Sequence, residues 1–459
     1  MAEKAVHTSA RSAHEIDMLH GPVFGKYIRF ILPLAFGYIL QLLFNAADII
    51  VVGRFAGAAS LAAVGSTTAL VNLYLQIYIG IATGVNIVVA GAYATGNHEK
   101  VSNTVHTAIG MALLCGAVFL GLGLLTVRPI LIAVGSPSDI IDLSALYMYI
   151  YCIGMPASVI YNFGASILRS IGDTKRPMYY LVAAGVVNCV LNVISVVIFH
   201  MGVAGVAIAT TASNYISAVL VMNALLHEDS SLKVELKKIC LDRTVIWDIL
   251  KSGVPIAVQN SFFTIPNIMI QSAVNTYGSV YVAGNAASQS IEGFQIAFLN
   301  ANGIATATFL SQHTSAGKYR RADSVLRMIL ISSVVMSLAI GLCFFVLRFP
   351  LLGLYNRDSE VIGIGARRLT IMVMTDFMDV TMCNLSNAIR GYGRYFPPTL
   401  ITLIFVCGFR MAWLMLLWPF FHTYEFIILA WPVSWILAIT VLTLYYLHTR
   451  GMFPKEDLC

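Results

Sequence analysis

Long apolar runs separated by short polar breaks extend over most of the chain. Many of these runs exceed the roughly 20 residues that an α-helix needs to cross a bilayer, and Gly, Pro and charged residues fill the breaks. We therefore predict an all-α integral membrane protein with twelve transmembrane helices. The predicted spans cover residues 27–54, 61–94, 101–126, 140–167, 177–199, 203–227, 246–276, 281–312, 324–347, 361–389, 397–418 and 425–448.

Composition and charge support this class and add an orientation. Hydrophobic residues make up 58% of the chain and charged residues only 11%, which lies outside the range of soluble domains. Lys and Arg gather in the connections on one side, so the positive-inside rule predicts that both termini are cytoplasmic. The first apolar run is too long for a signal peptide and is expected to remain as a span. The other side carries only Arg54, Arg128, Arg348, Arg357, Arg367 and Arg368.

The two halves of the chain repeat each other. Leu32-Pro33-Leu34-Ala35 returns as Val254-Pro255-Ile256-Ala257, and Arg169 with Gly172 returns as Arg390 with Gly393. Six spans in each half give both copies the same orientation, related by an axis along the membrane normal. We predict a first lobe over residues 1–227, a solvated cytoplasmic linker with an amphipathic helix over 228–245, and a second lobe over 246–459.

An acidic residue lies inside the first predicted span, where the nearest basic residue is Arg54. A carboxylate in hydrocarbon costs several kcal/mol unless it faces water, a partner or a bound cation. Asp48 is therefore either a structural hydrogen-bonding group or a site for a coupling cation. One helical face also carries Tyr38, Gln41 and Asn45, which recur with Asp48 at i, i+3, i+7 and i+10.

The fifth span offers partners for this acid. Asn188, Asn192 and Ser195 fall at i, i+4 and i+7, so they share one face. Their oxygens can ligate a hard cation or hydrogen-bond a carboxylate. If this face meets the first span, Asp48 gains neutral partners and no fixed cation. The alternative is that the two asparagines only join helices.

The second lobe is expected to hold several ionisable groups in apolar surroundings, namely Glu292, Asp376, Asp379 and Arg410. A mid-span Arg almost requires an acidic partner, so we expect Arg410 to pair with Asp379 or Glu292. The remaining acid suits a cationic substrate in a cleft. A closed structural network of ion pairs is the alternative.

Two further groups of residues have candidate roles. A polar stripe along the seventh span, which includes Asn260 and Gln271, is expected to line the substrate cleft. The repeated Arg169 and Arg390, each at a cytoplasmic helix end, are either topology anchors or a cytoplasmic gate.

The whole chain resembles the multidrug and toxic compound extrusion (MATE) family of secondary transporters, near its DNA-damage-inducible branch. The resemblance rests on the segments LPLAFGYILQLLFNAADIIVVGRFAGAASLAAVG, GVVNCVLN, GVAGVAIATTAS, VAGNAASQSIEGF and AIRGYGRYFPP. It implies a V-shaped fold of two lobes around a central cleft, in a bacterial cytoplasmic membrane. It also implies export of organic, often cationic, compounds in exchange for H⁺ or Na⁺.

Individual positions sharpen this comparison with the family. Asp48 matches the family's first-span acid and Asn188 its fifth-span Asn. Asn192 stands where many members have a second Asp, which removes one charge from the expected cation site and favours H⁺ over Na⁺. The seventh-span acid of another branch is absent from this sequence.

These observations leave one functional alternative and disfavour several classes. The related architecture of a lipid-linked saccharide flippase is the alternative, although such proteins usually carry two extra spans and a basic groove. No Walker A motif, nucleophile–base pair or cysteine–histidine metal motif is present, so neither ATP-driven transport nor an enzyme is expected. We expect no cofactor or metal beyond the coupling ion, no nucleic-acid partner, and a monomer.

Overall fold

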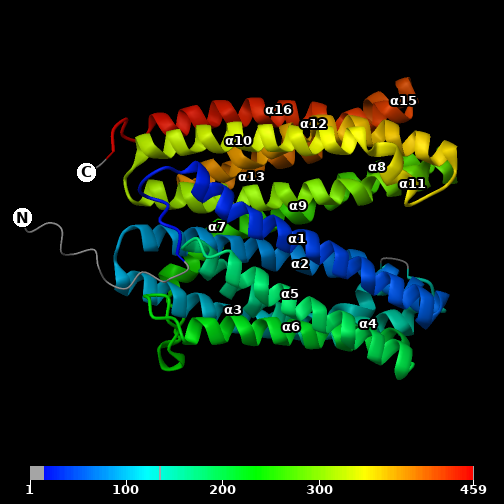
Figure 1. The fold of residues 1–459 in the computed structure, drawn as a ribbon, viewed down its shortest axis with the longest axis horizontal. Coiled ribbons are helices and arrows are strands. Elements are labelled where there is room, and N and C mark those ends of the chain that lie inside the picture. Colours follow the sequence, from blue (N-terminus) through cyan, green and yellow to red (C-terminus); the bar gives the residue numbers. More distant parts are fainter. Residues whose placement is uncertain (1–14, 134–135, 458–459) are drawn as a thin grey trace, which may run out of the picture. The chain divides into compact units, whose positions relative to one another are not determined.

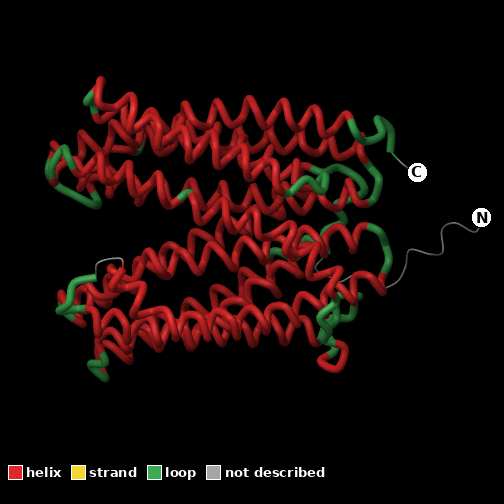
Figure 2. The backbone as a smooth tube through the Cα atoms, turned by 180° about the vertical axis from the view of Figure 1, so that it is seen from behind, coloured by secondary structure: helices red, strands yellow, loops and turns green. Residues whose placement is uncertain are grey.

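The structure is a computed structural model that describes residues 15–133 and 136–457. Its described residues form helices joined by short loops, with no strand among them (Figures 1 and 2). The first half contains α1 (Phe24–Val51), η1 (Val52–Ala56), α2 (Ala58–Ala94), α3 (His98–Ala133), α4 (Ile141–Ser170), α5 (Lys175–Asn192), η2 (Val193–Ile198) and α6 (Gly202–Leu226). The segments η1 and η2 are π-helical continuations of α1 and α5.

The connection η3 (Leu236–Lys238) leads into the second half of the chain. This half contains α7 (Arg243–Phe262), α8 (Thr264–Asn275), α9 (Ser279–Ser315), α10 (Tyr319–Val346), α11 (Arg348–Gly353), α12 (Ser359–Gly391), α13 (Phe396–Thr402), η4 (Leu403–Gly408), α14 (Phe409–Ala412), η5 (Trp413–Leu417), α15 (Trp418–Phe421) and α16 (Tyr424–Gly451). The elements from α13 to α15 form one span that contains two π-helical segments, η4 and η5.

Nine helical spans in the described part of the chain are long and apolar enough to cross a membrane. The helix pair α7–α8 and the helices α9 and α12 have similar lengths but more polar residues, because they carry most of the second lobe's candidate site residues. Together they make the twelve predicted spans. Most predicted ends lie within a few residues of the observed ones, although α3 continues further, to Ala133.

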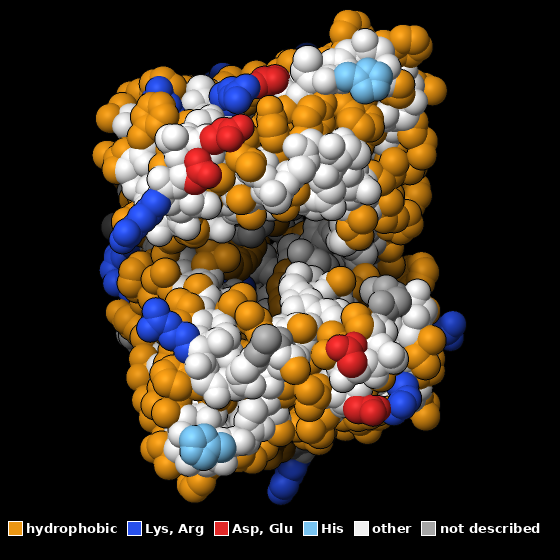
Figure 3. Space-filling view, turned by 90° about the vertical axis from the view of Figure 1, so that its right-hand side faces the viewer, with side chains coloured by type: hydrophobic (Ala, Val, Ile, Leu, Met, Phe, Trp, Pro, Cys, Tyr) orange, Lys and Arg blue, Asp and Glu red, His pale blue; other side chains and the backbone are white. Residues whose placement is uncertain are grey.

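Large apolar side chains on the surface fit an environment of lipid. Leu125, Leu354 and Phe420 are among the most exposed of them. Figure 3 looks onto one end of the helices, where hydrophobic and uncharged polar surface are mixed and the Lys, Arg, Asp and Glu side chains appear in small, separate groups. Exposed apolar surface of this extent is stable in a bilayer and costly in water.

Each half builds its bundle around its fourth span. In the first unit α4 packs against α2, α3 and α6, and in the second unit α12 packs against α9, α10 and α16. These helices hold equivalent positions in the repeat. The packing therefore repeats along with the sequence.

The compact units do not divide at the predicted lobe boundaries. Within the described residues, the first unit comprises 15–17, 36–133 and 136–253, and the second comprises 18–35 and 254–457. The start of α1 thus belongs to the second unit, where Tyr27 hydrogen-bonds Asn302 and stands edge-on to Phe309. The start of α7 belongs to the first unit, where a Cβ on Gly253 would lie 2.7 Å from the Ile81 Cα. The start of α7 belongs to the first unit because Gly253 allows it to pack closely against α2.

The segment predicted as a solvated linker is docked on the first unit instead. The Glu235 amide donates to His106 Nε2 at 2.9 Å, and the Val234 amide donates to the Leu225 carbonyl at 2.9 Å. Leu232 and Val234 are fully buried, and before α7 starts at Arg243 the segment contains only the single turn η3. Apolar side chains at these two positions hold it against α3 and α6.

The end of this segment is fixed by Asp242. Its carboxylate accepts hydrogen bonds from Asn103 Nδ2 at 2.9 Å and from the Thr244 and Val245 amides. These bonds, led by the one from Asn103, lower the pKa of Asp242. The carboxylate therefore stays charged and keeps capping the start of α7 until the pH falls below the ordinary range for an Asp side chain.

Candidate functional site

The first-unit site is formed where α1 packs against α5. Gly185 allows the close approach, because a Cβ there would lie 1.9 Å from the Phe44 ring. Asp48 lies one turn beyond Phe44 on α1, and Asn192 lies two turns beyond Gly185 on α5. The two polar side chains are thereby brought together, as the sequence predicts.

The described hydrogen-bond partner of the Asp48 carboxylate is a neutral amide. Asn192 Nδ2 donates to Asp48 Oδ1 and also to Asn188 Oδ1, the latter at 3.2 Å. Asn188 Nδ2 in turn donates to Thr210 Oγ1 on α6 at 3.4 Å. Among the residues that the structure describes, no Lys or Arg is paired with Asp48.

The Asn192 side chain has a second, unused atom. Its Oδ1 is buried and has no hydrogen-bond partner among the described residues. A buried acceptor without a donor is uncommon and costly. Beside a carboxylate, such an oxygen can accept a proton-bearing group or ligate a small cation.

The other predicted members of this site are less closely involved. Gln41 is half-buried and Asn45 is exposed, and neither forms a described hydrogen bond with Asp48. The Tyr147 and Cys189 side chains do interact electrostatically with Asp48. Ser195 instead bonds the carbonyl oxygens of Leu191 and Gly205, so it joins α5 to α6.

Both helices of this site become π-helical directly beyond it. The segment η1 starts four residues after Asp48, and η2 starts immediately after Asn192. Short π-helical segments occur frequently at functional sites. Both therefore mark the end of the helix pair where Asp48 and Asn192 meet.

The second unit contains a buried ion pair that the sequence interpretation missed. Glu292 on α9 is paired with Arg368 on α12 by two hydrogen bonds of 3.0 and 2.9 Å, and it also accepts one from Ser288. The Arg368 side chain is only 2% exposed. The sequence interpretation counted Arg368 only among the basic residues of the outer side, and its alternative that Arg410 pairs with Glu292 is wrong.

A chain of side-chain amides extends from this ion pair. Arg368 NH1 donates to Asn285 Oδ1 at 3.0 Å, and Asn285 Nδ2 donates to Gln271 Oε1 at 3.0 Å. Gln271 Nε2 then donates to Asn275, which is exposed. The polar stripe is divided between two helices, because α7 ends at Phe262 and α8 starts at Thr264. Asn260 lies before this break and is half-buried.

Arg410 has neutral partners rather than the predicted ion pair. Its Nε donates to Ser434 Oγ at 2.9 Å, and its guanidinium lies 5.4 and 5.7 Å from the ring centroids of Trp431 and Trp435. Asp379 interacts with it electrostatically, but no described hydrogen bond or ion pair joins the two. Stacking on two indole rings stabilises the guanidinium and explains why a contacting acid is not required.

Asp376 and Asp379 are acids of the second unit whose carboxylates have no described hydrogen-bond or ion-pair partner. Asp376 is buried and Asp379 half-buried, and Asp376 interacts electrostatically with both Asp379 and Glu292. Neither carboxylate forms a described hydrogen bond or ion pair. Glu292 is thus bound to Arg368, Asp379 interacts with Arg410, and Asp376 interacts with the two other carboxylates.

The repeated arginines lie in different surroundings. Arg390 is buried and donates to Gln259, Thr399 and Asn387, all within the second unit. Arg169 is half-buried, and its Nε has no hydrogen-bond partner among the described residues. Arg390 thus binds α7 to α12 and α13, which fits the reading as a structural anchor.

The predicted span 361–389 already contains Arg368, and one sequence signal shows where its helix starts. Asp358 caps the start of α12 by accepting a hydrogen bond from the Glu360 amide at 2.9 Å. An Asp followed two residues later by Glu marks a helix start, so Arg368 falls more than two turns inside the span. It then stands eight residues from Asp376, on the same face of the helix.

A family model described as MatE matches the chain twice, over residues 33–194 and 255–414. The two matches correspond to the two halves of the predicted repeat. Among curated proteins, the probable multidrug resistance protein YoeA of Bacillus subtilis is 27% identical over 389 residues, covering 83% of each chain. The probable multidrug resistance protein NorM of Thermotoga maritima is 24% identical over 398 residues, covering 84% of each chain.

Solved structures with the same fold include the outward-facing conformation of a multidrug resistance MATE family transporter of the MOP superfamily. Its TM-score is 0.89 at 19% sequence identity, and the match covers 96% of this chain and 99% of that one. A Vibrio cholerae MATE transporter, VcmN, matches with a TM-score of 0.87 at 18% identity, over 94% of this chain and 97% of that one. At these identities the likeness supports the all-helical fold.

Proposed function

Because this chain belongs to the multidrug and toxic compound extrusion (MATE) family, we propose that it is an antiporter that exports organic, cationic compounds in exchange for H⁺ or Na⁺. We further propose that it works by alternating access, as a monomer in a bacterial cytoplasmic membrane, with both termini in the cytoplasm. Its relatives named as multidrug resistance proteins support drug export. The coupling ion and the charge of the substrate are inferred from the site.

The observation that carries this proposal is the surroundings of Asp48. The carboxylate is held by Asn192, beside an unpartnered Asn192 oxygen, with no basic partner in the described chain. A negative charge within a bilayer needs compensation. Because the protein supplies none here, an H⁺ or a Na⁺ from outside is the natural counter-charge.

The neutral Asn192 favours H⁺ of the two ions. One carboxylate oxygen pair and two amide oxygens provide few ligands and a single negative charge. A proton needs only one oxygen, whereas a bare cation needs several oxygens in a defined shell. Asn192 orients the carboxylate, and its free Oδ1 can accept a hydrogen bond from the protonated acid.

The contribution of the membrane potential depends on the net charge that each transport cycle moves inward. Each charge gains ~2.3 kcal/mol per 100 mV of membrane potential, which supports a gradient of roughly 50-fold. When a monovalent cation leaves in exchange for one ion, the potential cancels and the ion's chemical gradient drives export.

We assign the second unit's acids to the substrate rather than to the coupling ion. Glu292 forms an ion pair with Arg368. The carboxylates of Asp376 and Asp379 can therefore attract a positive group of the substrate. Arg410 limits the net negative charge of this cluster. The arrangement suits a cationic compound that must also be released.

Proteoliposomes with separately imposed ion gradients test the proposal. We expect an inwardly directed proton gradient to drive ethidium out of its compartment, and we expect a sodium gradient at equal pH to have less effect. Transport driven by sodium alone would transfer the coupling role to Na⁺. If neither gradient moved ethidium, or if ATP were required, the proposed antiport would be wrong.

A further inference from the structure

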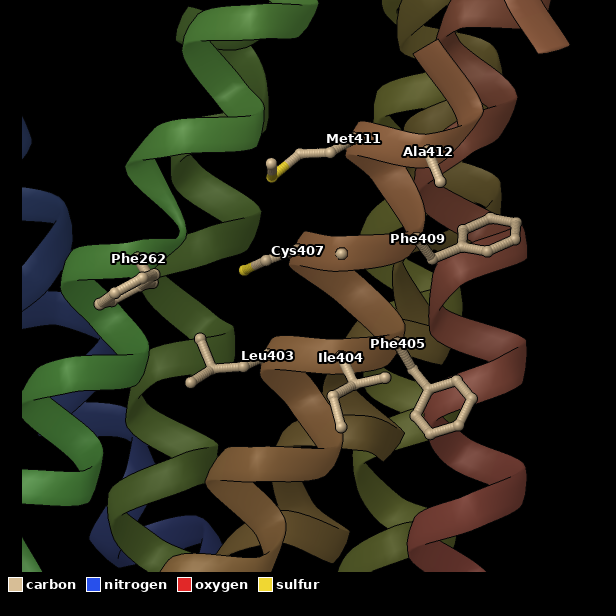
Figure 4. Close-up of a pocket in the computed structure, with 9 residues that line it drawn as sticks. Phe262, Leu403, Ile404, Phe405, Cys407, Phe409, Met411 and Ala412 are labelled. Atoms are coloured by element: carbon tan, nitrogen blue, oxygen red, sulfur yellow. The ribbon is translucent and has the colours of Figure 1, made fainter. Parts of the chain in front are cut away.

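Two further features of the described chain lie outside the ion sites above. An apolar groove lies between the last turn of α7 and the span that contains η4, where Leu403 and Cys407 face Phe262 (Figure 4). Every side chain that lines it is apolar, as expected of a surface that faces lipid. The second feature is polar and buried. It joins α3 to the docked segment, which comprises residues 228–242.

The docked segment is attached to α3 through the ring of His106. Gly110 lets the two approach closely, because a Cβ there would lie 2.6 Å from the Cys240 carbonyl oxygen. His106 is buried at this contact. Its Nε2 accepts a hydrogen bond from the Glu235 amide at 2.9 Å, and its Nδ1 lies 2.7 Å from the Ser102 carbonyl oxygen. Both ring nitrogens therefore have a partner.

These two partners fix the protonation state of the ring. The Ser102 carbonyl oxygen can only accept a hydrogen bond, so Nδ1 must carry a hydrogen. The Glu235 amide can only donate one, so Nε2 must offer a lone pair. Neutral imidazole with its hydrogen on Nδ1 is the form that satisfies both conditions. An imidazolium would turn a second N–H toward the Glu235 amide, and one donor would face another.

The second unit has a permanent cation at the equivalent place. At the offset that relates Arg169 to Arg390, His106 corresponds to Arg327 near the start of α10. Arg327 is exposed, and its Nε donates to the Asp323 carbonyl oxygen of its own helix at 3.4 Å. A cation at this position offers no acceptor to a backbone amide. The neutral His106 therefore suits the docked segment in a way that Arg cannot.

The acids nearest to His106 stay charged while a histidine gains its proton. Glu235 interacts electrostatically with His106, and its hydrogen bond with Lys238 lowers the pKa of its carboxyl. The hydrogen bond from Asn103 likewise lowers the pKa of Asp242. No charged residue occurs in α2. The other ionisable groups at this end of α3 and on the neighbouring elements are His98, Glu99 and Lys100 on α3, Arg169 on α4, Glu228, Asp229, Lys233 and Lys237 on the docked segment, and Arg243 on α7.

We propose that His106 is a proton site that controls the docking of this segment. Protonation of the ring breaks the contact with the Glu235 amide and releases residues 235–240 from α3, while Val234 and Asp242 keep their own attachments on either side. The docked form holds the ring neutral and so binds one proton fewer than the released form, which means that acid favours release. Because the segment leads into α7, acid loosens one of the attachments at the start of that helix. The ligand is a proton, whichever ion drives transport.

Hydrogen–deuterium exchange of the purified full chain in nanodiscs tests this proposal. Histidine side chains change charge between about pH 5 and pH 8, so amide protection factors, corrected for the intrinsic effect of pH on exchange, are measured across this range. We expect protection over residues 235–240 to fall about tenfold toward the acid end, as for the loss of one buried hydrogen bond. Protection in α4, which contains no histidine, should stay constant and serves as the internal reference.

Substitutions of His106 separate its role from a general effect of acid. His106→Gln supplies an amide oxygen that can accept the same hydrogen bond without titrating, so protection should stay high across the range. His106→Arg introduces the cation found at Arg327, so the segment should be unprotected even at the alkaline end. His227→Gln is the matched control, because His227 is exposed and its ring bonds the Asn223 carbonyl oxygen. This control should keep the wild-type response to pH.

Constant protection of residues 235–240 across the pH range in the wild-type chain would overturn the proposal. An equal fall in His106→Gln and in the wild type would also overturn it, because the segment would then respond through another group. If His106→Gln fails to fold, His106→Leu makes the same distinction. Leu offers no acceptor at any pH, so protection in this variant should be low and independent of pH. A wild-type response in His106→Leu would contradict the assignment.

Discussion

The two units place acidic residues in the membrane under opposite conditions. In the first unit the described hydrogen-bond partner of Asp48 is the neutral Asn192, whereas in the second unit Glu292 is bound to Arg368 and Asp379 interacts with Arg410. The scaffolds are related by the repeat, and Arg368 stands where the first unit has Tyr147. The acids themselves lie at different positions of the repeat, because Glu292 corresponds to Val71 and not to Asp48. Both the acid and its basic partner therefore differ between the two units.

The two units of the repeat differ in how the charge of a buried acid is compensated. The helices α4 and α12 occupy the same central place in their bundles, and each lies close to its unit's acid. A permanent ion pair fixes a helix pair, while a carboxylate with neutral partners is free to gain and lose a cation. We expect the second unit to keep its charges throughout transport and the first unit to change its charge.

The largest effect on stability is expected from breaking the Glu292–Arg368 pair. Arg368→Ala leaves Glu292 buried without a cation, and such losses cost about 3–5 kcal/mol. The unfolding temperature in detergent should fall steeply. The double variant Glu292→Met with Arg368→Leu removes both charges and is expected to be far more stable than Arg368→Ala. Equal destabilisation by the single and double variants would contradict the pairing.

A smaller loss is expected at Arg410, because its partners are neutral. Arg410→Ala removes a charge-assisted hydrogen bond to Ser434 and the stacking on Trp431 and Trp435. Together these contribute roughly 2–3 kcal/mol. Arg410→Lys keeps the charge but loses the planar stacking, so it should fall between Ala and wild type in thermal unfolding. A loss greater than that of Arg368→Ala would show that Arg410 holds the more important pair.

Asn192→Ala is expected to slow transport rather than to unfold the first unit. It removes the hydrogen bond to Asp48, and a hydrogen bond to a charged group contributes about 1.5–3 kcal/mol. The rate of ethidium efflux from energised cells should therefore fall at least tenfold, with normal expression. Asn45→Ala is the control, since Asn45 is exposed and does not bond Asp48. Equal effects of the two variants would remove Asn192 from the site.

The smallest effect is expected where two charges meet in an exposed position. Arg128 and Asp142 are 3.0 Å apart with side chains 54% and 79% exposed. Exposed pairs of this kind contribute about 0–1 kcal/mol. Arg128→Ala should leave both the unfolding temperature and efflux close to wild type. A clear loss in either measurement would show that exposure is a poor guide to the importance of ion pairs in this chain.

Much of the fold follows from sequence patterns because lipid imposes them. The apolar runs, the repeated motifs and the facing of Asp48 toward Asn192 all reflect local periodicity, which the structure preserves. The choice of partner for Arg410 depends instead on tertiary packing. Trp431 and Trp435 lie four residues apart on α16, and nothing in local periodicity shows that they face α14.

The boundaries of the two compact units could not be predicted from the sequence, because they also depend on tertiary contacts. The sequence of the 228–245 segment is charged and polar, which is typical of a solvated linker, but two apolar residues suffice to dock it. The exchange of the first parts of α1 and α7 depends on close contacts such as Gly253 with Ile81. Such contacts join residues far apart in the chain and leave no periodic signal.

The most direct test of the account is proton-driven ethidium transport by Asp48→Asn and Asp376→Asn in proteoliposomes. The account predicts that Asp48→Asn binds ethidium but no longer transports it under a proton gradient. It predicts that Asp376→Asn remains proton-coupled and instead binds ethidium more weakly. Coupled transport at the wild-type rate by Asp48→Asn would contradict the claim that this carboxylate carries the coupling ion.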